Sequence, residues 1–65
     1  MMAVLELSDR RKFACCDLEA AINAWRDNFP ADLDARIIVY PRLGNANRIL
    51  SYIYDLEQSK WVEAN

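Results

Sequence analysis

The sequence has no histidine, a single glycine and only two cysteines among its 65 residues. Histidine is the most common general base and a common metal ligand, and one glycine does not build a glycine-rich phosphate loop. Cys15 and Cys16 are adjacent, so they neither join distant parts of a fold nor have the spacing of a zinc site. The sequence therefore predicts no catalytic residue, no metal site and no cofactor.

Long apolar runs are also missing, because no run approaches the roughly 20 residues that span a membrane. Residues 1–7 lack the basic and apolar regions of a secretory signal peptide. The two cysteines suit a reducing compartment, so we expect a cytoplasmic protein. A formal net charge of −2 argues against both a strongly basic nucleic-acid binder and a highly acidic nucleic-acid mimic.

The length predicts one small domain over residues 1–65. A chain of this size buries only about 60% of the surface that its unfolded form exposes, so its stability is marginal without further support. Disulfides, metals and oligomerisation are the usual supports. Because the cysteines and the missing histidine argue against the first two, we expect oligomerisation or an unusually good core.

Residues 17–28 have the clearest helical pattern. Asp17 is a suitable N-cap, and Pro30 forces Phe29 out of the helical region and ends the helix. Trp25 is the largest side chain of the apolar stripe, and its spacing favours a core anchor over a stacking platform for a ligand. The stripe recurs at the spacing of a single helix face and comprises Leu18, Ala21, Ile22, Trp25 and Phe29.

Residues 45–61 are predicted to form a final helix. Six of the eight residues in the segment 49–56 are apolar, and at about 100° per residue they spread over an arc of about 200°. This arc is wider than the stripe needed to cover one core, which predicts contact with a partner. Leu50, Tyr52, Tyr54 and Trp61 are the expected partner-binding residues. Ile53, like Trp25, is expected in the core.

Residues 31–43 allow two interpretations. Asp32 could cap a short helix, whereas residues 36–40 are β-branched and aromatic like a buried strand. The fold predicted is mostly α, a small domain of two or three helices. The alternative is an α+β fold, a minimal βαβα arrangement with strands near residues 3–7 and 36–40.

Residues 33–58 also resemble a helix-turn-helix, with Gly44 as the turn glycine. In this alternative Asn45, Asn47 and Arg48 begin the recognition helix, where base-reading residues lie, and Arg42 contacts the DNA backbone. Pro41 interrupts the first helix of this pattern. DNA binding by a small dimeric regulator is therefore the second hypothesis.

The segment 13–30 has a dense motif at the start of the predicted helix, with a proline soon after: Leu18, Glu19, Ala20, Ala21, Ile22, Asn23, Trp25, Arg26 and Pro30. This motif resembles the opening of a short uncharacterised bacterial family, the domain of unknown function 3717, whose members carry a stretch like I-E-A-A-I-N-x-W-R followed by a proline. The resemblance implies a helical first half and a bacterial or phage source, and it implies no catalytic residue.

Together these patterns predict a non-enzymatic protein–protein interaction module that forms a homodimer through its final helix. The size class adds the hypothesis that a phage or another mobile element uses the protein to inhibit a larger host protein. A membrane partner is not expected, and nucleic acid is a partner only in the second hypothesis.

Overall fold

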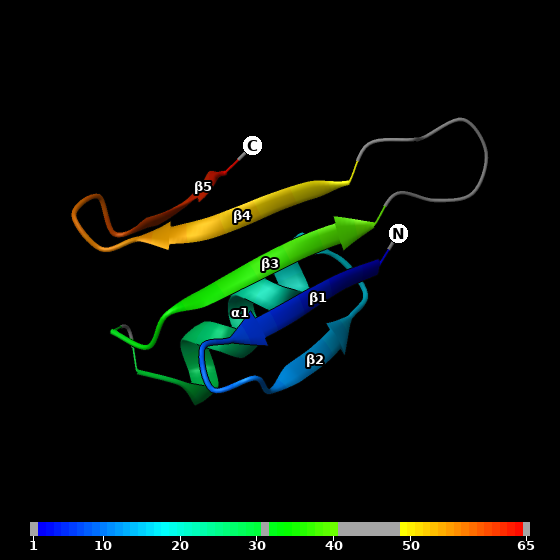
Figure 1. Cartoon of the computed structure of the whole chain (residues 1–65), viewed down its shortest axis with the longest axis horizontal. Helices are drawn as coiled ribbons and strands as arrows, with labels where there is room; N and C mark the ends of the chain where they lie inside the picture. The colour runs from blue at the N-terminus through cyan, green and yellow to red at the C-terminus, as the bar shows by residue number, and fades with distance from the viewer. Residues whose placement is uncertain (1, 31, 41–48, 65) are drawn as a thin grey trace.

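The computed structural model describes residues 2–30, 32–40 and 49–64 (Figure 1). The five strands within these ranges form one antiparallel sheet in the order β2-β1-β3-β4-β5, with the helix α1 on one face. The elements in chain order are β1 (Met2–Leu7), β2 (Lys12–Cys15), α1 (Leu18–Asn28), β3 (Ala35–Tyr40), β4 (Leu50–Asp55) and β5 (Lys60–Glu63).

The predicted mostly α fold is wrong, because residues 45–61 do not form a helix. Their described part contains β4, a turn and the start of β5. The Asp55 carboxylate accepts hydrogen bonds from the backbone N–H groups of Glu57 and Gln58 at 3.0 and 3.4 Å. An aspartate that bonds the backbone two residues on is typical of a turn. The wide apolar arc therefore reflects a strand with apolar residues on both faces.

Residues 36–40 belong to β3, which settles their conformation as a strand. Both strands of the α+β alternative exist, as β1 and β3, but they are antiparallel neighbours and not the parallel pair of a βαβ unit. β1 and β3 are antiparallel because the hairpin between β1 and β2 reverses the chain before α1 begins. The helix then connects β2 to β3, and β1 lies between these two strands.

The helix predicted over residues 17–28 is confirmed. The Asp17 carboxylate accepts a hydrogen bond from the Ala20 N–H at 2.8 Å, which satisfies one free donor of the first turn. Phe29 is extended, with φ −135° and ψ 151°, and its N–H donates to the Trp25 carbonyl. Within the described ranges, no helix has the length and apolar character needed to cross a bilayer.

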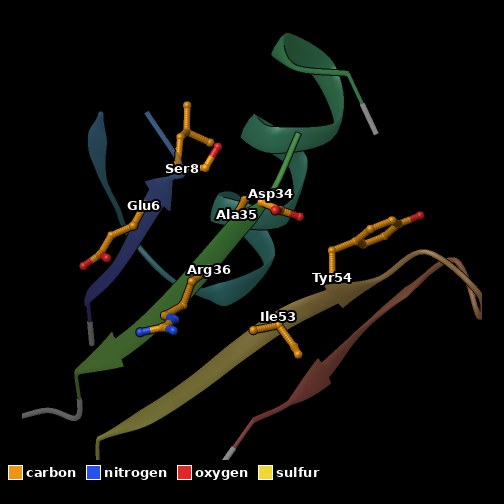
Figure 2. Close-up of a pocket in the computed structure, with 8 residues that line it drawn as sticks. Glu6, Ser8, Asp34, Ala35, Arg36, Ile53 and Tyr54 are labelled. Carbon is orange, nitrogen blue, oxygen red and sulfur yellow. The ribbon is translucent and has the colours of Figure 1, made fainter. Parts of the chain in front are cut away.

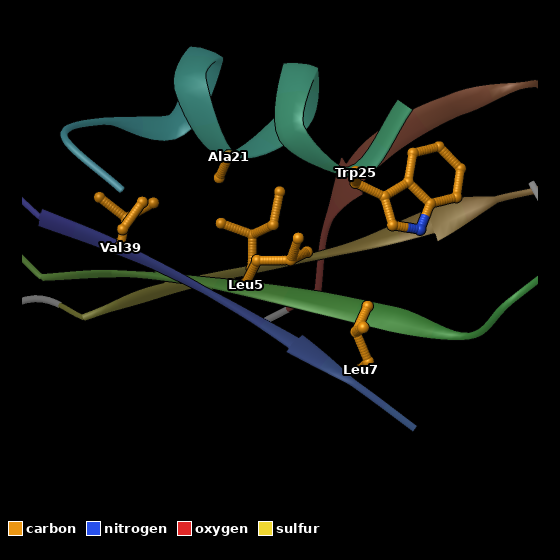
Figure 3. Close-up of a cluster of buried hydrophobic side chains, with 7 residues drawn as sticks. Leu5, Leu7, Ala21, Trp25 and Val39 are labelled. Carbon is orange, nitrogen blue, oxygen red and sulfur yellow. The ribbon is translucent and has the colours of Figure 1, made fainter. Parts of the chain in front are cut away.

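The core lies between α1 and the middle of the sheet (Figure 3). Trp25 is only 4% exposed, which confirms its place in the core, whereas Ile53 is 41% exposed. The prediction that Ile53 is a core residue is wrong, because side chains alternate along a strand and its neighbours Tyr52 and Tyr54 face α1. The buried apolar residues are Ala3, Leu5, Leu7, Ala21, Trp25, Ile37 and Val39.

Candidate functional site

The helix covers only part of its face of the sheet. Among the described residues, the backbone of α1 lies close to β1, β2 and β3 but not to β4 or β5. A helix is about 10 Å across and strands lie about 4.8 Å apart, so one helix covers about two strands. In the described part of the chain, the hairpin of β4 and β5 therefore has no helix over it on this side (Figure 1).

The predicted partner-binding residues all lie on this incompletely covered side. The register places Leu50 opposite Val39 and Tyr52 opposite Ile37, whose side chains face α1. Residues directly opposite in an antiparallel pair share a face. We call this half-buried set the β4–β5 surface, and it comprises Leu50, Tyr52, Tyr54 and Trp61.

Three aromatic rings connect the β4–β5 surface to the helix. The Trp25 ring centroid lies 4.4 Å from that of Tyr54 and 5.2 Å from that of Trp61. The Tyr54 and Trp61 centroids are 5.6 Å apart, with planes at 63°. Aromatic pairs in such tilted and edge-to-face arrangements contribute about 0.5–1.5 kcal/mol each beyond the burial of their area. Side chains thus hold the hairpin against α1.

Both indole N–H groups of this cluster lack a hydrogen-bond acceptor among the described residues. The Nε1 atoms of Trp25 and Trp61 are buried and unpaired. A buried donor without an acceptor costs about 1–3 kcal/mol, and buried tryptophan N–H groups usually find a partner. The cluster therefore holds two donors that an added acceptor could satisfy.

A shallow groove of about 390 Å³ lies beside the three rings. One wall is α1, where Ile22 and Arg26 are four residues apart and share a helix side. Arg26 gives the groove positive charge, although its Nε also donates to the neighbouring Asp27 at 3.3 Å. Lys60 borders the groove at the start of β5, but it pairs with Asp55 and so belongs to the other face of the sheet. We call it the aromatic groove, and its lining contains no carboxylate: Ile22, Trp25, Arg26, Tyr54, Ser59, Lys60 and Trp61.

The opposite face of the sheet has no described element packed on it. Here the register places Val4 opposite Ile38, and Ile53 between Arg36 and Val62. Met2 is 45% exposed and Ile53 is 41% exposed. We call this apolar set the helix-free surface, and it comprises Met2, Val4, Ile38, Tyr40, Ile53 and Val62.

Sequence reasoning missed the helix-free surface, although residues 36–40 carry its signal. In that run Ile37 and Val39 enter the core, while Ile38 and Tyr40 point to the other face. Residues 37–40 are apolar on both faces of the strand, a pattern typical of a sheet covered on both faces.

A row of charged residues of both signs crosses the same face of the sheet and ends at Ile53. Glu6 lies between Lys12 and Arg36 in the register. Next to them is a cleft of about 460 Å³, and Figure 2 shows Arg36 and Ile53 pointing away from α1 while Tyr54 points toward its side. The cleft is lined by Glu6, Leu7, Ser8, Asp34, Ala35, Arg36, Ile53 and Tyr54.

Comparisons with protein-family models, with curated proteins and with solved structures find no match for this chain. The resemblance of residues 13–30 to the domain of unknown function 3717 stays a prediction. Any assignment of function therefore depends on the surfaces described above.

The DNA-binding alternative loses its structural basis. Its two helices are wrong, since residues 35–40 and 50–55 are the strands β3 and β4. The proposed base-reading and backbone-contacting residues Arg42, Asn45, Asn47 and Arg48 lie outside the described residues.

Titratable groups near the first hairpin have shifted pKa values. The pKa of Asp9 is lowered because Arg11 donates to its carboxylate at 2.8 Å, and the same bond raises the pKa of Arg11. Burial raises the pKa of the half-buried Cys15 thiol, and negative charge at Cys16 and Asp17 adds to the effect. Both cysteines are free, and the described residues contain no cluster of metal-ligating side chains.

Proposed function

We propose that the protein is a non-enzymatic protein-interaction module that forms a homodimer by packing the helix-free surfaces of two copies face to face. The observation that supports this is an apolar sheet face with Met2 and Ile53 exposed at 45% and 41%. Soluble monomers rarely leave a contiguous apolar face to water, and such patches mark interaction sites.

The charges around this face suit a second copy as the occupant. A two-fold dimer needs a surface that is complementary to itself. Here an apolar centre adjoins Lys12, Glu6 and Arg36, which follow one another across β2, β1 and β3. Two copies facing each other can place the carboxylate of one against a cation of the other, while Ile38 and Ile53 pack in the centre.

The area of the face is sufficient for a dimer of modest affinity. Five strands about 4.8 Å apart, with up to six residues at about 3.3 Å each, give a face on the order of 500 Å². Two such faces bury on the order of 1,000 Å², which is the lower limit for specific interfaces. We therefore expect dimers at micromolar protein concentrations and monomers on dilution.

Sedimentation equilibrium over a range of concentrations tests the proposal. The wild type should approach twice the 7.5 kDa mass of one chain, whereas Ile53→Glu should stay monomeric because it buries a charge in the interface. Leu56→Glu is the matched control, since Leu56 is 56% exposed but lies in the turn between β4 and β5. A wild type that is monomeric throughout, or an Ile53→Glu variant that dimerises like the control, would contradict the proposal.

This dimer leaves the β4–β5 surface free on the outer side, as the proposed contact for a different protein. A larger host protein is the partner that the sequence-based hypothesis names, and a bacterial or phage source stays a prediction. We place the dimer in a reducing cytoplasm, which suits the free thiols of Cys15 and Cys16.

A further inference from the structure

We infer that the two-fold axis of the proposed homodimer runs between β1 and β3, along these strands, so that Glu6 of each copy forms an ion pair with Arg36 of the other. The inference rests on the proposed function, because it requires the helix-free surfaces of two copies to face each other. It adds the position of the axis and the two charged residues that select a second copy as the partner.

The side chains of Glu6 and Arg36 both lie on the helix-free face of the sheet. Glu6 stands between the buried Leu5 and Leu7, and Arg36 precedes the buried Ile37, so alternation along each strand directs both charges away from α1. Figure 2 shows Arg36 pointing away from the helix. The ion pairs in the described part of the chain include neither residue. Both charges are therefore available to a second copy.

A two-fold axis midway between two antiparallel neighbours makes the register within one copy decide the contacts between copies. Such an axis places each of the two strands over the other strand of the second copy, so every residue faces its own register partner. For β1 and β3, this brings opposite charges together and apolar side chains together. The facing pairs are Glu6 with Arg36, Val4 with Ile38, and Met2 with Tyr40.

Other central positions of the axis lack this complementarity. An axis along β3 places Arg36 over the same residue of the second copy, and an axis between β3 and β4 places it over the apolar Ile53. An axis across the strands places β1 over β1, which contains no cation for Glu6 to meet. A charge that is buried without a partner destabilises the interface, so these arrangements are disfavoured.

Positions of the axis near either edge of the sheet cover too little of it. An axis between β1 and β2 pairs Glu6 with Lys12, but it leaves β3, β4 and β5 outside the interface. An axis between β4 and β5 leaves out the other three strands in the same way. The axis between β1 and β3 covers β2, β1, β3 and β4, which is what an interface near the lower size limit requires.

The two side chains are long enough to meet across the interface. Facing sheets lie about 10 Å apart, a distance that an extended glutamate and an extended arginine span together. Aligned sheets cross at about 30°, which displaces distant residues but moves those beside the axis least. Because Glu6 and Arg36 are also neighbours within each copy, the four charges alternate in sign around the axis.

Charge reversal followed by mixing tests the inference. Glu6→Lys and Arg36→Glu each put like charges at both contacts, so each variant alone should dimerise at least about tenfold more weakly than the wild type. An equimolar mixture of the two should dimerise like the wild type. In the mixed dimer the new lysine meets the new glutamate, and Arg36 of one chain meets Glu6 of the other. Sedimentation equilibrium measures each sample, and circular dichroism confirms that each variant is folded.

Two further variants separate a specific pair from a general effect of charge. Glu57→Lys changes the net charge as Glu6→Lys does but lies in the turn between β4 and β5, so it should dimerise like the wild type. Lys12→Glu should not restore dimers when it is mixed with Glu6→Lys. Restoration by Lys12→Glu would place the axis between β1 and β2 and would overturn the inference.

The remaining outcomes distinguish this inference from the proposed function. A wild type that stays monomeric overturns the homodimer and this inference together. A wild type that dimerises overturns only the inference if the folded single variants dimerise equally well, or if their mixture stays as weak as each variant alone. In those cases the helix-free surfaces still pair, but around a different axis.

Discussion

Trp25 and Trp61 pack edge to face, with ring centroids 5.2 Å apart and planes at 82°, and this contact joins α1 to the last strand. Among the described residues, the backbone of α1 is not close to β4 or β5. The helix meets these strands through side chains, namely where Trp25 packs on Tyr54 and along the aromatic groove. Trp25 therefore has two roles. It fills the core beneath the helix, and it forms the wall against which the final hairpin rests.

Replacing Trp25 should cost far more stability than replacing Trp61. Trp25 is 4% exposed, and truncating a buried tryptophan to alanine costs about 3–5 kcal/mol, which is enough to unfold a domain of this size. Trp61 is half-buried, so Trp61→Ala should cost less and leave a folded protein. Urea unfolding followed by circular dichroism measures both variants. Equal losses would show that the hairpin is as important to the fold as the helix.

Ile37 and Ile53 form a matched pair for testing the core. Ile37 is fully buried and Ile53 is 41% exposed. Ile37→Ala should lower the free energy of unfolding by about 2–5 kcal/mol at every protein concentration. Ile53→Ala should cost little in dilute protein but more as the concentration rises, because it weakens the proposed dimer. A concentration-independent loss for Ile53→Ala would mean that its side chain supports the monomer.

The local signals of α1 made that helix predictable, while the strands depended on distant residues. Asp17 and Pro30 lie next to the helix and fix its ends, so the sequence alone contains the information. In the segment 49–56 the same apolar residues fit both a helix period and a strand period. The pairing of Tyr52 with Ile37 decides between them, and pairing with a distant strand is not visible in a local pattern.

The hairpin between β1 and β2 was missed for a different reason. Three-residue hairpin turns usually have glycine at the position with a left-handed backbone. Here Arg10 occupies that conformation with φ 77°, and its N–H donates to the Leu7 carbonyl at 3.0 Å. The turn therefore lacks its usual sequence signal.

The four expected partner-binding residues were chosen from the sequence because they are large and apolar or aromatic. The sequence analysis placed them on a helix, whereas they lie on the strands β4 and β5.

Arg10→Gly should stabilise the protein by about 0.5–1 kcal/mol. A left-handed backbone costs a non-glycine residue about 1–2 kcal/mol, and part of this gain is offset by the greater freedom of glycine in the unfolded chain. Arg10→Ala is the control, because it removes the side chain but keeps the strained backbone. Thermal melts should show a higher Tm for the glycine variant only. A similar rise with alanine would attribute the effect to the lost charge.

Cys15 should react with iodoacetamide several-fold more slowly than Cys16 at pH 8. Cys15 is half-buried, its Sγ lies 3.9 Å from the Phe13 carbonyl oxygen, and burial raises its pKa. Since the thiolate is the reactive form, both the cover and the raised pKa slow the reaction, whereas Cys16 is exposed. The variants Cys16→Ser and Cys15→Ser isolate the two thiols for mass spectrometry. Urea should abolish the difference, and equal rates in the folded variants would contradict the burial of Cys15.

The raised pKa of Cys15 also predicts a pH dependence of stability. The folded protein holds this proton more tightly than the unfolded chain, whose thiol titrates near the ordinary value of 9.0. The free energy by which the protonated Cys15 thiol stabilises the folded protein is therefore fully present below pH 9.0. It is lost as the pH rises through the raised pKa of the folded protein. Unfolding free energies at pH 8 and pH 10, on either side of 9.0, should fall more for the wild type than for Cys15→Ser. Subtracting the two removes the shared titration of lysines and tyrosines, so the remaining difference reports the Cys15 thiol alone.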